Sequence, residues 1–399
     1  MIPAAREAFN RGFEQRYYEN LKQEIVSTLG EPAAFRVSES PVFISKALKE
    51  QVFEACESIL AQMRAIDYEA VRQRFTPKHL QSPLPIANPH FLGIDFGLCD
   101  DGQGGIAPKL IELQAFPSLF YYQPILGQAF LNNYPTIPRE GYHYFFNGHD
   151  QESYYRELKR IILGPEAAEN VILLELFPEK QKTRIDFWAT RKELGIEVVC
   201  LTKVIKEGKD LFYRKDGRKV PIRRIYNRII FDELQRIENL QTQFNLFDDV
   251  NVEWITHPDW FFIVSKCIMP MLSHESIPPC YYLDDYPSDL DLSNYVLKPL
   301  FSFAGHGIEL YPTAEKIAQI TDKQNYLLQK KVNYVPLIKT NTEKNSKVEL
   351  RILYGRSEAE NRLKPLINLT RMGKGELINV SHQGSEETWI GSSISFFEK

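Results

Sequence analysis

The stretch that most constrains the fold lies between residues 171 and 201, where two apolar runs flank an amphipathic segment. The first run, VILLEL, and the second, IEVVCL, have the length and composition of buried strands. Between them, KTRIDFWATRKEL places Ile185, Trp188, Ala189 and Leu194 at helical spacing, and Gly195 follows as a helix-ending residue. A strand, a helix and a strand in this order predict a β-α-β unit, which implies a parallel sheet.

The composition predicts an ordinary globular protein with more than one structural unit. The chain has 399 residues, 43% of them hydrophobic, and a formal net charge of −4. This length allows two or three units, and a negative charge without a basic block argues against a general nucleic-acid binder. Five scattered cysteines are typical of reduced thiols, and no apolar run has the length of a signal-peptide core or a membrane span. We therefore expect a cytoplasmic protein that binds neither nucleic acid nor membrane.

Further strands and a helix are predicted on either side of this unit. HFLGIDFGL and KLIEL are joined by the glycine-rich loop CDDGQGGIAP, which predicts a hairpin with Asp95 and Glu112 on paired strands. LFYRKDGRKVPI predicts a second hairpin that turns at Asp216-Gly217. Residues 45–64 have helical periodicity, with Ser45 as the N-cap. Strand-like segments in the C-terminal part are NYLLQKKV, KVELRILYG, LKPLINLTRMG and ELINVSHQG.

The segment NYVLKPLFSFAGHGIEL, residues 294–310, delivers one lysine at a strand end and then a loop of small residues. Such a pattern is typical of polyphosphate sites, where Lys298 neutralises charge and backbone N–H groups near Gly305 and Gly307 bind phosphate oxygens. The same residues are equally compatible with a plain hairpin, with Ala304-Gly305 and His306-Gly307 as turn residues. A second lysine, Lys266, lies upstream in WFFIVSKCIMPML at the expected start of a helix.

In order along the chain, these lysine segments and the strand YLLQKKV resemble the ATP-grasp fold, in which ATP lies between two antiparallel sheets. Residues 90 to 335 resemble more closely the synthetase domain of glutathionylspermidine synthase and its circularly permuted ATP-grasp relatives. The segments that carry this resemblance are IDFGLCDD…KLIELQAFPSL, DGRKVPIRRIYNRI, SKCIMPML, YVLKPLFSFAGHGI and YLLQKKVNYVPL. The resemblance implies an α+β and α/β chain with a permuted ATP-grasp fold and a preceding Rossmann-like βαβ domain. The expected parts are 1–165 with the metal-binding hairpin, 166–260 with the βαβ domain, and 261–399 with the nucleotide site.

The resemblance also implies a magnesium site. Mg²⁺ prefers oxygen ligands, and Asp95, Glu112 and Gln114 occupy the positions where the family has Asp and then Glu-x-Asn. Without the resemblance, Asp95 reads as a solvent-facing strand residue and Glu112 as a salt-bridge partner. The sequence departs from the family pattern at Gly93, where the family has arginine, and at Gln114, where it has asparagine.

The remaining site residues follow from the same resemblance. The phosphates and adenine of ATP are expected to be bound by Lys266, Lys298, Ser302, Gly305, Gly307, Gln329 and Lys330. Arg351, Arg371 and Asn379 are the candidate catalytic residues, with surface strand positions as the alternative, and Ser118 and Arg228 are candidate substrate ligands.

The implied reaction is ATP- and Mg²⁺-dependent ligation of a small-molecule or peptide carboxylate to an amine through an acyl phosphate. Two other functions remain open, namely a degenerate module that binds ATP without catalysis and an ATP-grasp phosphotransferase. The departures at Gly93 and Gln114 favour the degenerate module.

Overall fold

The central feature of the computed structural model is a five-stranded antiparallel sheet built from both ends of the chain. The structure describes residues 2–83, 88–302, 307–342, 344–357, 361–378 and 387–399. The sheet has the strand order β17-β16-β15-β2-β3, formed by Gly391–Ser393, Arg362–Gly373, Lys347–Ser357, Phe91–Asp100 and Ile106–Gln114. The hairpin expected around Asp95 and Glu112 is therefore confirmed, and it pairs with strands some 250 residues later in the sequence.

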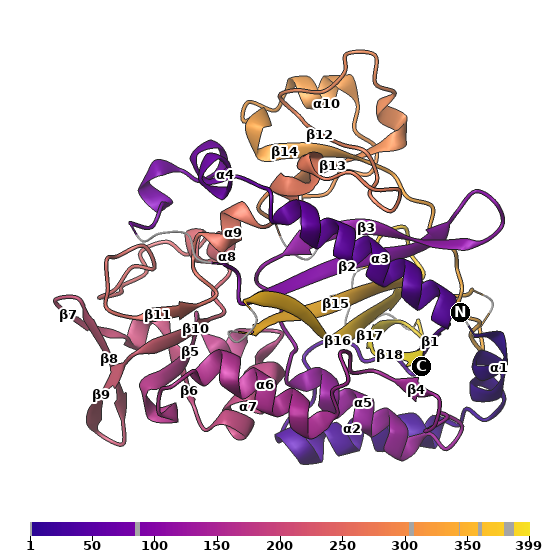
Figure 1. The fold of residues 1–399 in the computed structure, drawn as a ribbon, viewed down its shortest axis with the longest axis horizontal. Helices are drawn as coiled ribbons and strands as arrows, with labels where there is room; N and C mark the ends of the chain where they lie inside the picture. The colour runs from indigo at the N-terminus through magenta and orange to yellow at the C-terminus, as the bar shows by residue number, and fades with distance from the viewer. Residues whose placement is uncertain (1, 84–87, 303–306, 343, 358–360, 379–386) are drawn as a thin grey trace.

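Helix α3, Lys46–Met63, lies across this sheet in Figure 1. Its apolar stripe is buried, including Cys56, and the Ser45 hydroxyl accepts a hydrogen bond from the Leu48 N–H, as expected for an N-cap. The helix therefore covers the sheet with the face that the sequence periodicity predicts.

A four-stranded parallel sheet confirms the β-α-β prediction. Its strand order is β11-β10-β5-β6, formed by Glu253–Ile255, Arg224–Asn227, Val171–Glu175 and Glu197–Cys200. Helix α7, Arg184–Leu194, connects β5 to β6 and ends at Gly195, whose φ of 71° is left-handed. Figure 1 shows this sheet beside the central one, with α6, Gln151–Leu163, and α7 packed along it.

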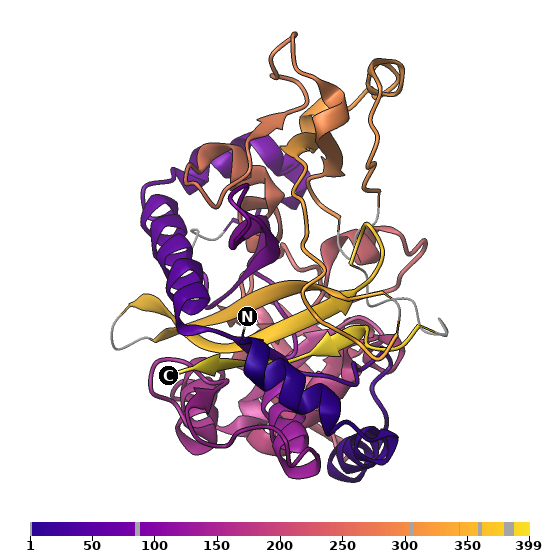
Figure 2. The ribbon, with the colours of Figure 1, turned by 90° about the vertical axis from the view of Figure 1, so that its right-hand side faces the viewer.

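A small antiparallel sheet projects above the central sheet in Figures 1 and 2. Its strand order is β12-β14-β13, formed by Cys280–Tyr282, Tyr326–Lys330 and Tyr295–Pro299. With helix α10, Ala314–Ala318, it encloses a separate apolar cluster that includes Leu297, Ile317 and Leu328. This part of the chain therefore has a core of its own, opposite the edge strand β3.

The other elements complete the two larger cores. They are the helices α1 Pro3–Arg11, α2 Gln15–Leu29, α4 Tyr68–Phe75, α5 Tyr122–Asn133, α8 Phe231–Gln235 and α9 Trp260–Ile263, and the strands β1 Val42–Ile44, β4 Tyr142–His143, β7 Ile205–Glu207, β8 Asp210–Lys215, β9 Arg218–Ile222 and β18 Ser395–Glu398. The β8–β9 hairpin turns at Asp216-Gly217 as predicted, with both residues at positive φ. No helix within the described residues combines the length and apolarity needed to cross a membrane.

Lys266 lies at the start of a helix, as expected, and this helix is a 3-10 helix over Lys266–Met271. Pro270 lies inside the segment and cannot donate a backbone hydrogen bond, which disfavours an α-helix there. One local prediction was wrong. The strand expected over 376–384 is absent from residues 376–378, and the rest of it lies outside the described residues. Gly373 and Gly375 flank the end of β16, where the regular extended conformation stops.

Candidate functional site

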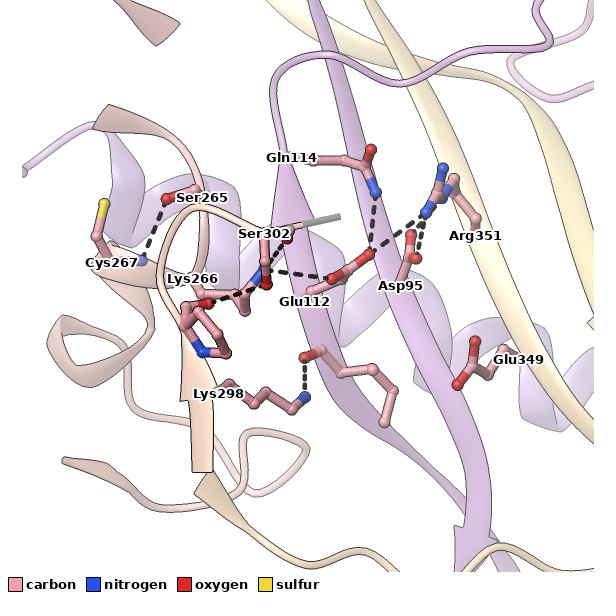
Figure 3. Close-up of polar contacts among 12 residues, drawn as sticks. Asp95, Glu112, Gln114, Ser265, Lys266, Cys267, Lys298, Ser302, Glu349 and Arg351 are labelled. Carbon is pink, nitrogen blue, oxygen red and sulfur yellow. Dashed lines mark hydrogen bonds and ion pairs between the residues drawn. The ribbon is translucent and has the colours of Figure 1, made fainter. Parts of the chain in front are cut away.

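One face of the central sheet carries a row of charged side chains, because residues two apart on a strand point to the same side. Asp95 on β2 lies opposite Glu112 on β3 and opposite Arg351 on β15. Glu349, two residues before Arg351 on β15, lies opposite Arg371 on β16. Figure 3 shows the side chains of Asp95, Glu112 and Arg351 converging on this face. Antiparallel register thus brings together residues that are far apart in the sequence.

Asp95 is fully buried and its two oxygens are both bound by arginines. Arg351 Nε and Nη2 donate to Oδ1 and Oδ2, each at 2.6 Å, and Arg371 Nη2 also contacts Oδ2. The expectation of a solvent-facing strand residue is therefore wrong. The predicted role of Asp95 as a metal ligand stays untested, but in this structure its carboxylate orients two guanidinium groups.

Glu112 lies closer to solvent than Asp95, with a side-chain exposure of 25%. Its Oε1 accepts from Gln114 Nε2 at 3.1 Å, and Arg351 Nη2 lies 3.6 Å from the same oxygen. Lys266 Nζ is 3.9 Å from Oε2. Burial acts to raise the pKa of Glu112, but the cations of Lys266, Arg371, Arg351 and Lys298 outweigh it and the pKa lies below the ordinary value. This carboxylate is consequently ionised at neutral pH.

Glu349 is the second glutamate of the site, and unlike Glu112 it is buried. Tyr334 Oη donates to its Oε1 at 2.6 Å, and Arg371 Nη2 lies 3.2 Å from Oε2. Burial raises the pKa of Glu349, although Arg371 and the Tyr334 hydroxyl oppose that shift. The Tyr334 ring lies against Gly97, where a Cβ would be only 2.7 Å from Tyr334 Cε1, so this close approach requires glycine. Tyr334 lies in the segment YLLQKKVNYVPL but was not predicted as a site residue.

The two lysines predicted to bind phosphate, Lys266 and Lys298, lie next to the edge strand β3 of the central sheet. Lys266 Nζ donates to the Ser302 carbonyl at 2.6 Å, and Lys298 Nζ donates to the Ile111 carbonyl at 3.2 Å. Gln329 Nε2 donates to the Leu110 carbonyl at 2.9 Å. Burial lowers the pKa of Lys298, while the nearby Glu112 carboxylate opposes the shift. Side chains of β13 and β14 thus meet the backbone of β3, and the lysines lie beside Glu112.

A cavity of about 420 Å³ separates the small sheet from the central one. Its polar lining includes Glu112, Lys298, Gln329, Lys330, Lys331, Tyr334, Lys347, Glu349, Arg371 and Glu376. Its apolar lining is formed by Ile111, Val296, Ile308, Leu310, Val332, Leu377 and Ile378. A cavity of this size that combines an apolar wall with a few charged groups is typical of a small-molecule site.

Two features mark the part of this cavity that follows β14. Among the described residues, neither the backbone N–H nor the C=O of Val332 has a hydrogen-bond partner. At the exposed edge, the Tyr311 hydroxyl donates to Glu376 Oε1 at 2.8 Å, and Lys331 Nζ lies 4.4 Å from the centre of the Tyr311 ring. The Tyr311–Glu376 contact joins the segment after β13 to the segment after β16.

The remaining predicted residues are placed as follows. Ser302 is buried beside Lys266, and Gly307 has a φ of 74° but does not line the cavity. Gly305 and Asn379 lie outside the described residues. Of the two described residues in this set, neither Ser302 nor Gly307 lines the cavity.

Arg228 and Ser118 lie at the loop that follows β3. Arg228 Nη1 donates to the Pro117 carbonyl at 2.7 Å, and Nη2 donates to the Phe116 carbonyl at 3.4 Å. The Asp186 carboxylate accepts from the backbone N–H groups of Leu119, Tyr121 and Tyr122. Arg228 therefore holds the loop that contains half-buried Ser118, and its predicted contact with a substrate carboxylate stays a prediction.

Gly93 lies next to this loop and next to Arg351. A Cβ at position 93 would lie 3.2 Å from Pro117 Cβ and 3.4 Å from Arg351 Cδ. Arg351 thus occupies the space beside the position at which the resembled family has an arginine.

Neither family models nor curated proteins match this chain. Among solved structures, it is similar to a glutathione synthetase-like effector from Globodera pallida in its apo form. The two share 12% sequence identity over 96% of each chain, with a TM-score of 0.60. This likeness shows the fold alone, a mixed α+β fold of the glutathione synthetase-like kind that is consistent with an ATP-grasp fold.

Proposed function

We propose that this protein is an ATP- and Mg²⁺-dependent carboxylate–amine ligase that forms an amide bond through an acyl phosphate. The observation that carries the proposal is the charge balance beside the 420 Å³ cavity. The cations in or beside the cavity are Lys266, Lys298, Lys330, Lys331, Lys347, Arg351 and Arg371, and the carboxylates are Asp95, Glu112, Glu349 and Glu376. Even with all four carboxylates ionised, these seven cations exceed them by three, which favours an anionic ligand such as a polyphosphate.

The cavity offers suitable groups for each part of a nucleotide. The backbone N–H and C=O of Val332, which have no partner within the described part of the chain, are suited to the edge of an adenine, and Val296 and Ile308 supply apolar surface for its faces. Lys266 and Lys298 are suited to the phosphates, together with the segment that contains Ser302, Gly305 and Gly307. Gln329 and Lys330 border the same space, although Gln329 is bound to the Leu110 carbonyl.

Glu112 and Gln114 fit a Mg²⁺ ion better than Asp95 does. Glu112 is ionised and partly exposed, and Gln114 uses its amide nitrogen on Glu112, so that its carbonyl oxygen is available. Asp95 has both oxygens bound by guanidinium groups, and we propose that its role is to position Arg351 and Arg371. A metal ion at Glu112 would neutralise charge on the phosphate groups during transfer.

Arg351 supports catalytic competence despite the missing arginine at position 93. Its side chain reaches the same space from β15, and Asp95 fixes its orientation. Preorganised cations at the point where charge develops are the main requirement of phosphoryl transfer. We place the acyl substrate between Arg351 and the loop of Pro117 and Ser118, which Arg228 holds in place.

One observation favours the degenerate ATP-binding module as a second candidate, namely that arginines donate to both oxygens of Asp95, the residue at the family's aspartate position. Product analysis separates the functions. A ligase releases ADP only when an acid and an amine are both present, a phosphotransferase forms a stable phosphate ester, and a binding module forms neither. A screen of amino acids, short peptides and polyamines for ADP release therefore tests the proposal.

A further inference from the structure

A second cavity, of about 250 Å³, lies behind the segment that follows Lys298. Five of its eleven lining residues are aromatic, and we call it the aromatic cavity after them: Phe75, Phe261, Phe262, Phe301 and Tyr326. These residues come from α4, α9, the segment after β13 and the start of β14. Because none of them lines the 420 Å³ cavity between the two sheets, the nucleotide cavity of our proposal, the aromatic cavity is a separate site.

The rings of the aromatic cavity present both faces and edges to one another. The Phe261 and Phe301 rings are stacked, with centroids 6.3 Å apart, and Phe262 meets Phe301 edge-on with centroids 5.3 Å apart. Phe261 and Phe262 are buried, whereas Phe301 and Tyr326 are half-buried. An aromatic ring carries negative charge on its face, so a wall of such rings attracts a cation that has lost part of its hydration.

Asp322 is the one charged side chain among the described residues that line the aromatic cavity. Its Oδ2 accepts from Asn325 Nδ2 at 3.1 Å, and no salt bridge to Asp322 occurs within the described residues. Asp322 and Tyr326 line the same cavity, and burial together with the Asp322 charge raises the pKa of Tyr326. The lining is therefore negative as well as aromatic, the opposite of the nucleotide cavity.

We propose that the aromatic cavity binds a small organic cation with an alkylammonium or methylated ammonium head group. The rings would contact the methyl or methylene groups, and Asp322 would balance the charge. An anionic ligand is disfavoured, because the described lining contains no lysine or arginine. This site goes beyond the proposed ligase function.

The position of the aromatic cavity connects it to the nucleotide site. Pro299 and Phe301 line it, directly after Lys298 and directly before Ser302, whose carbonyl binds Lys266. Between them, the Leu300 N–H donates to the Asn325 carbonyl at 2.8 Å. A cation bound there would contact the back of the segment that carries the phosphate-binding groups.

The test compares choline with its neutral isostere 3,3-dimethylbutan-1-ol, by calorimetric titration of the full-length protein. Choline is expected to bind about tenfold more tightly, since the two probes differ in charge but hardly in shape. Asp322→Asn should remove most of this preference, while Asp289→Asn, an exposed site outside the lining, should leave it unchanged. Phe301→Leu should weaken choline binding as well.

Equal affinities of the two probes for the natural protein would overturn the proposal and leave a plain apolar cavity. The absence of saturable choline binding at millimolar concentration would overturn it too. Because the comparison of probes uses the natural protein, it holds even if a variant fails to fold. The ligase proposal is tested by ADP release and does not depend on this outcome.

Discussion

Arg351 and Asp95 face each other on adjacent antiparallel strands, and the guanidinium group donates to both carboxylate oxygens at 2.6 Å. Both side chains are buried, and Arg371 approaches the same carboxylate from the next strand. A bidentate pair of this kind fixes orientation as well as charge. We propose that Arg351, whose direction is set by a buried aspartate, takes the place of the arginine that the resembled family has at position 93.

Asp95→Asn should lower the free energy of unfolding by about 3 kcal/mol, because it leaves two largely buried guanidinium groups without their shared counter-ion. Urea unfolding in the absence of Mg²⁺ measures this change. Asp100→Asn, at the exposed end of the same strand, is the control and should change the stability by less than about 1 kcal/mol. If Asp95→Asn were as stable as the natural protein and altered only the Mg²⁺ dependence of nucleotide binding, Asp95 would be a metal ligand after all.

Lys298→Met and Glu112→Gln should separate binding from turnover. Loss of the lysine removes a charge-assisted contact worth about 1.5–3 kcal/mol, so the Kd for ATP should rise roughly 10- to 150-fold. Loss of the Glu112 charge weakens the proposed Mg²⁺ site and should act mainly on kcat.

Titration with a fluorescent ATP analogue and single-turnover ADP release measure the two effects of these substitutions. Lys339→Met, an exposed lysine outside the cavity, should change neither quantity. Equal losses of binding and turnover in both site variants would show that this division of roles is wrong.

Tyr311→Phe should accelerate nucleotide entry. The substitution removes the hydroxyl that joins Tyr311 to Glu376 and keeps the ring above Lys331. Since the contact is exposed and therefore weak, the rise in the association rate should not exceed roughly fivefold. Stopped-flow mixing with a fluorescent ATP analogue gives this rate. An unchanged or slower rate would mean that the contact does not restrict access to the cavity.

Glu175→Gln should remove a pH dependence of stability. Burial raises the pKa of Glu175 from 4.5 to about 8, so the folded state holds a proton that the unfolded state loses in that interval. The free energy of unfolding of the natural protein should therefore fall as pH rises between these values, by at most about 1.4 kcal/mol per pH unit from this group. Urea unfolding at several pH values checks this. The same slope in the glutamine variant would exclude Glu175 as its source.

The sequence could predict those parts of the fold that local patterns determine. The β5–α7–β6 unit, the β2–β3 hairpin and the Asp216-Gly217 turn were confirmed, because each is marked by periodicity and a turn residue within a short stretch. Strand β11 was missed, since Glu253–Ile255 is too short to show a period and is held by its parallel partner β10.

The candidate site could be predicted only in part, since much of it depends on pairing between distant strands. Sequence motifs identify Lys298 and Glu112, and both residues line the cavity between the two sheets. Tyr334 reaches the site because its ring packs against Gly97, which has no side chain. Asp95 binds Arg351 on β15 and Arg371 on β16. No local pattern in the sequence records those contacts.

The central claim is that the cavity between the two sheets binds ATP, and urea unfolding with and without ATP–Mg²⁺ tests it most directly. A ligand that binds only the folded state at a hundredfold excess over its Kd adds about 2.7 kcal/mol to the free energy of unfolding. We predict a gain of this size for the natural protein and a much smaller one for Lys298→Met at the same ATP concentration. No gain for the natural, correctly folded protein at millimolar ATP–Mg²⁺ would contradict the account.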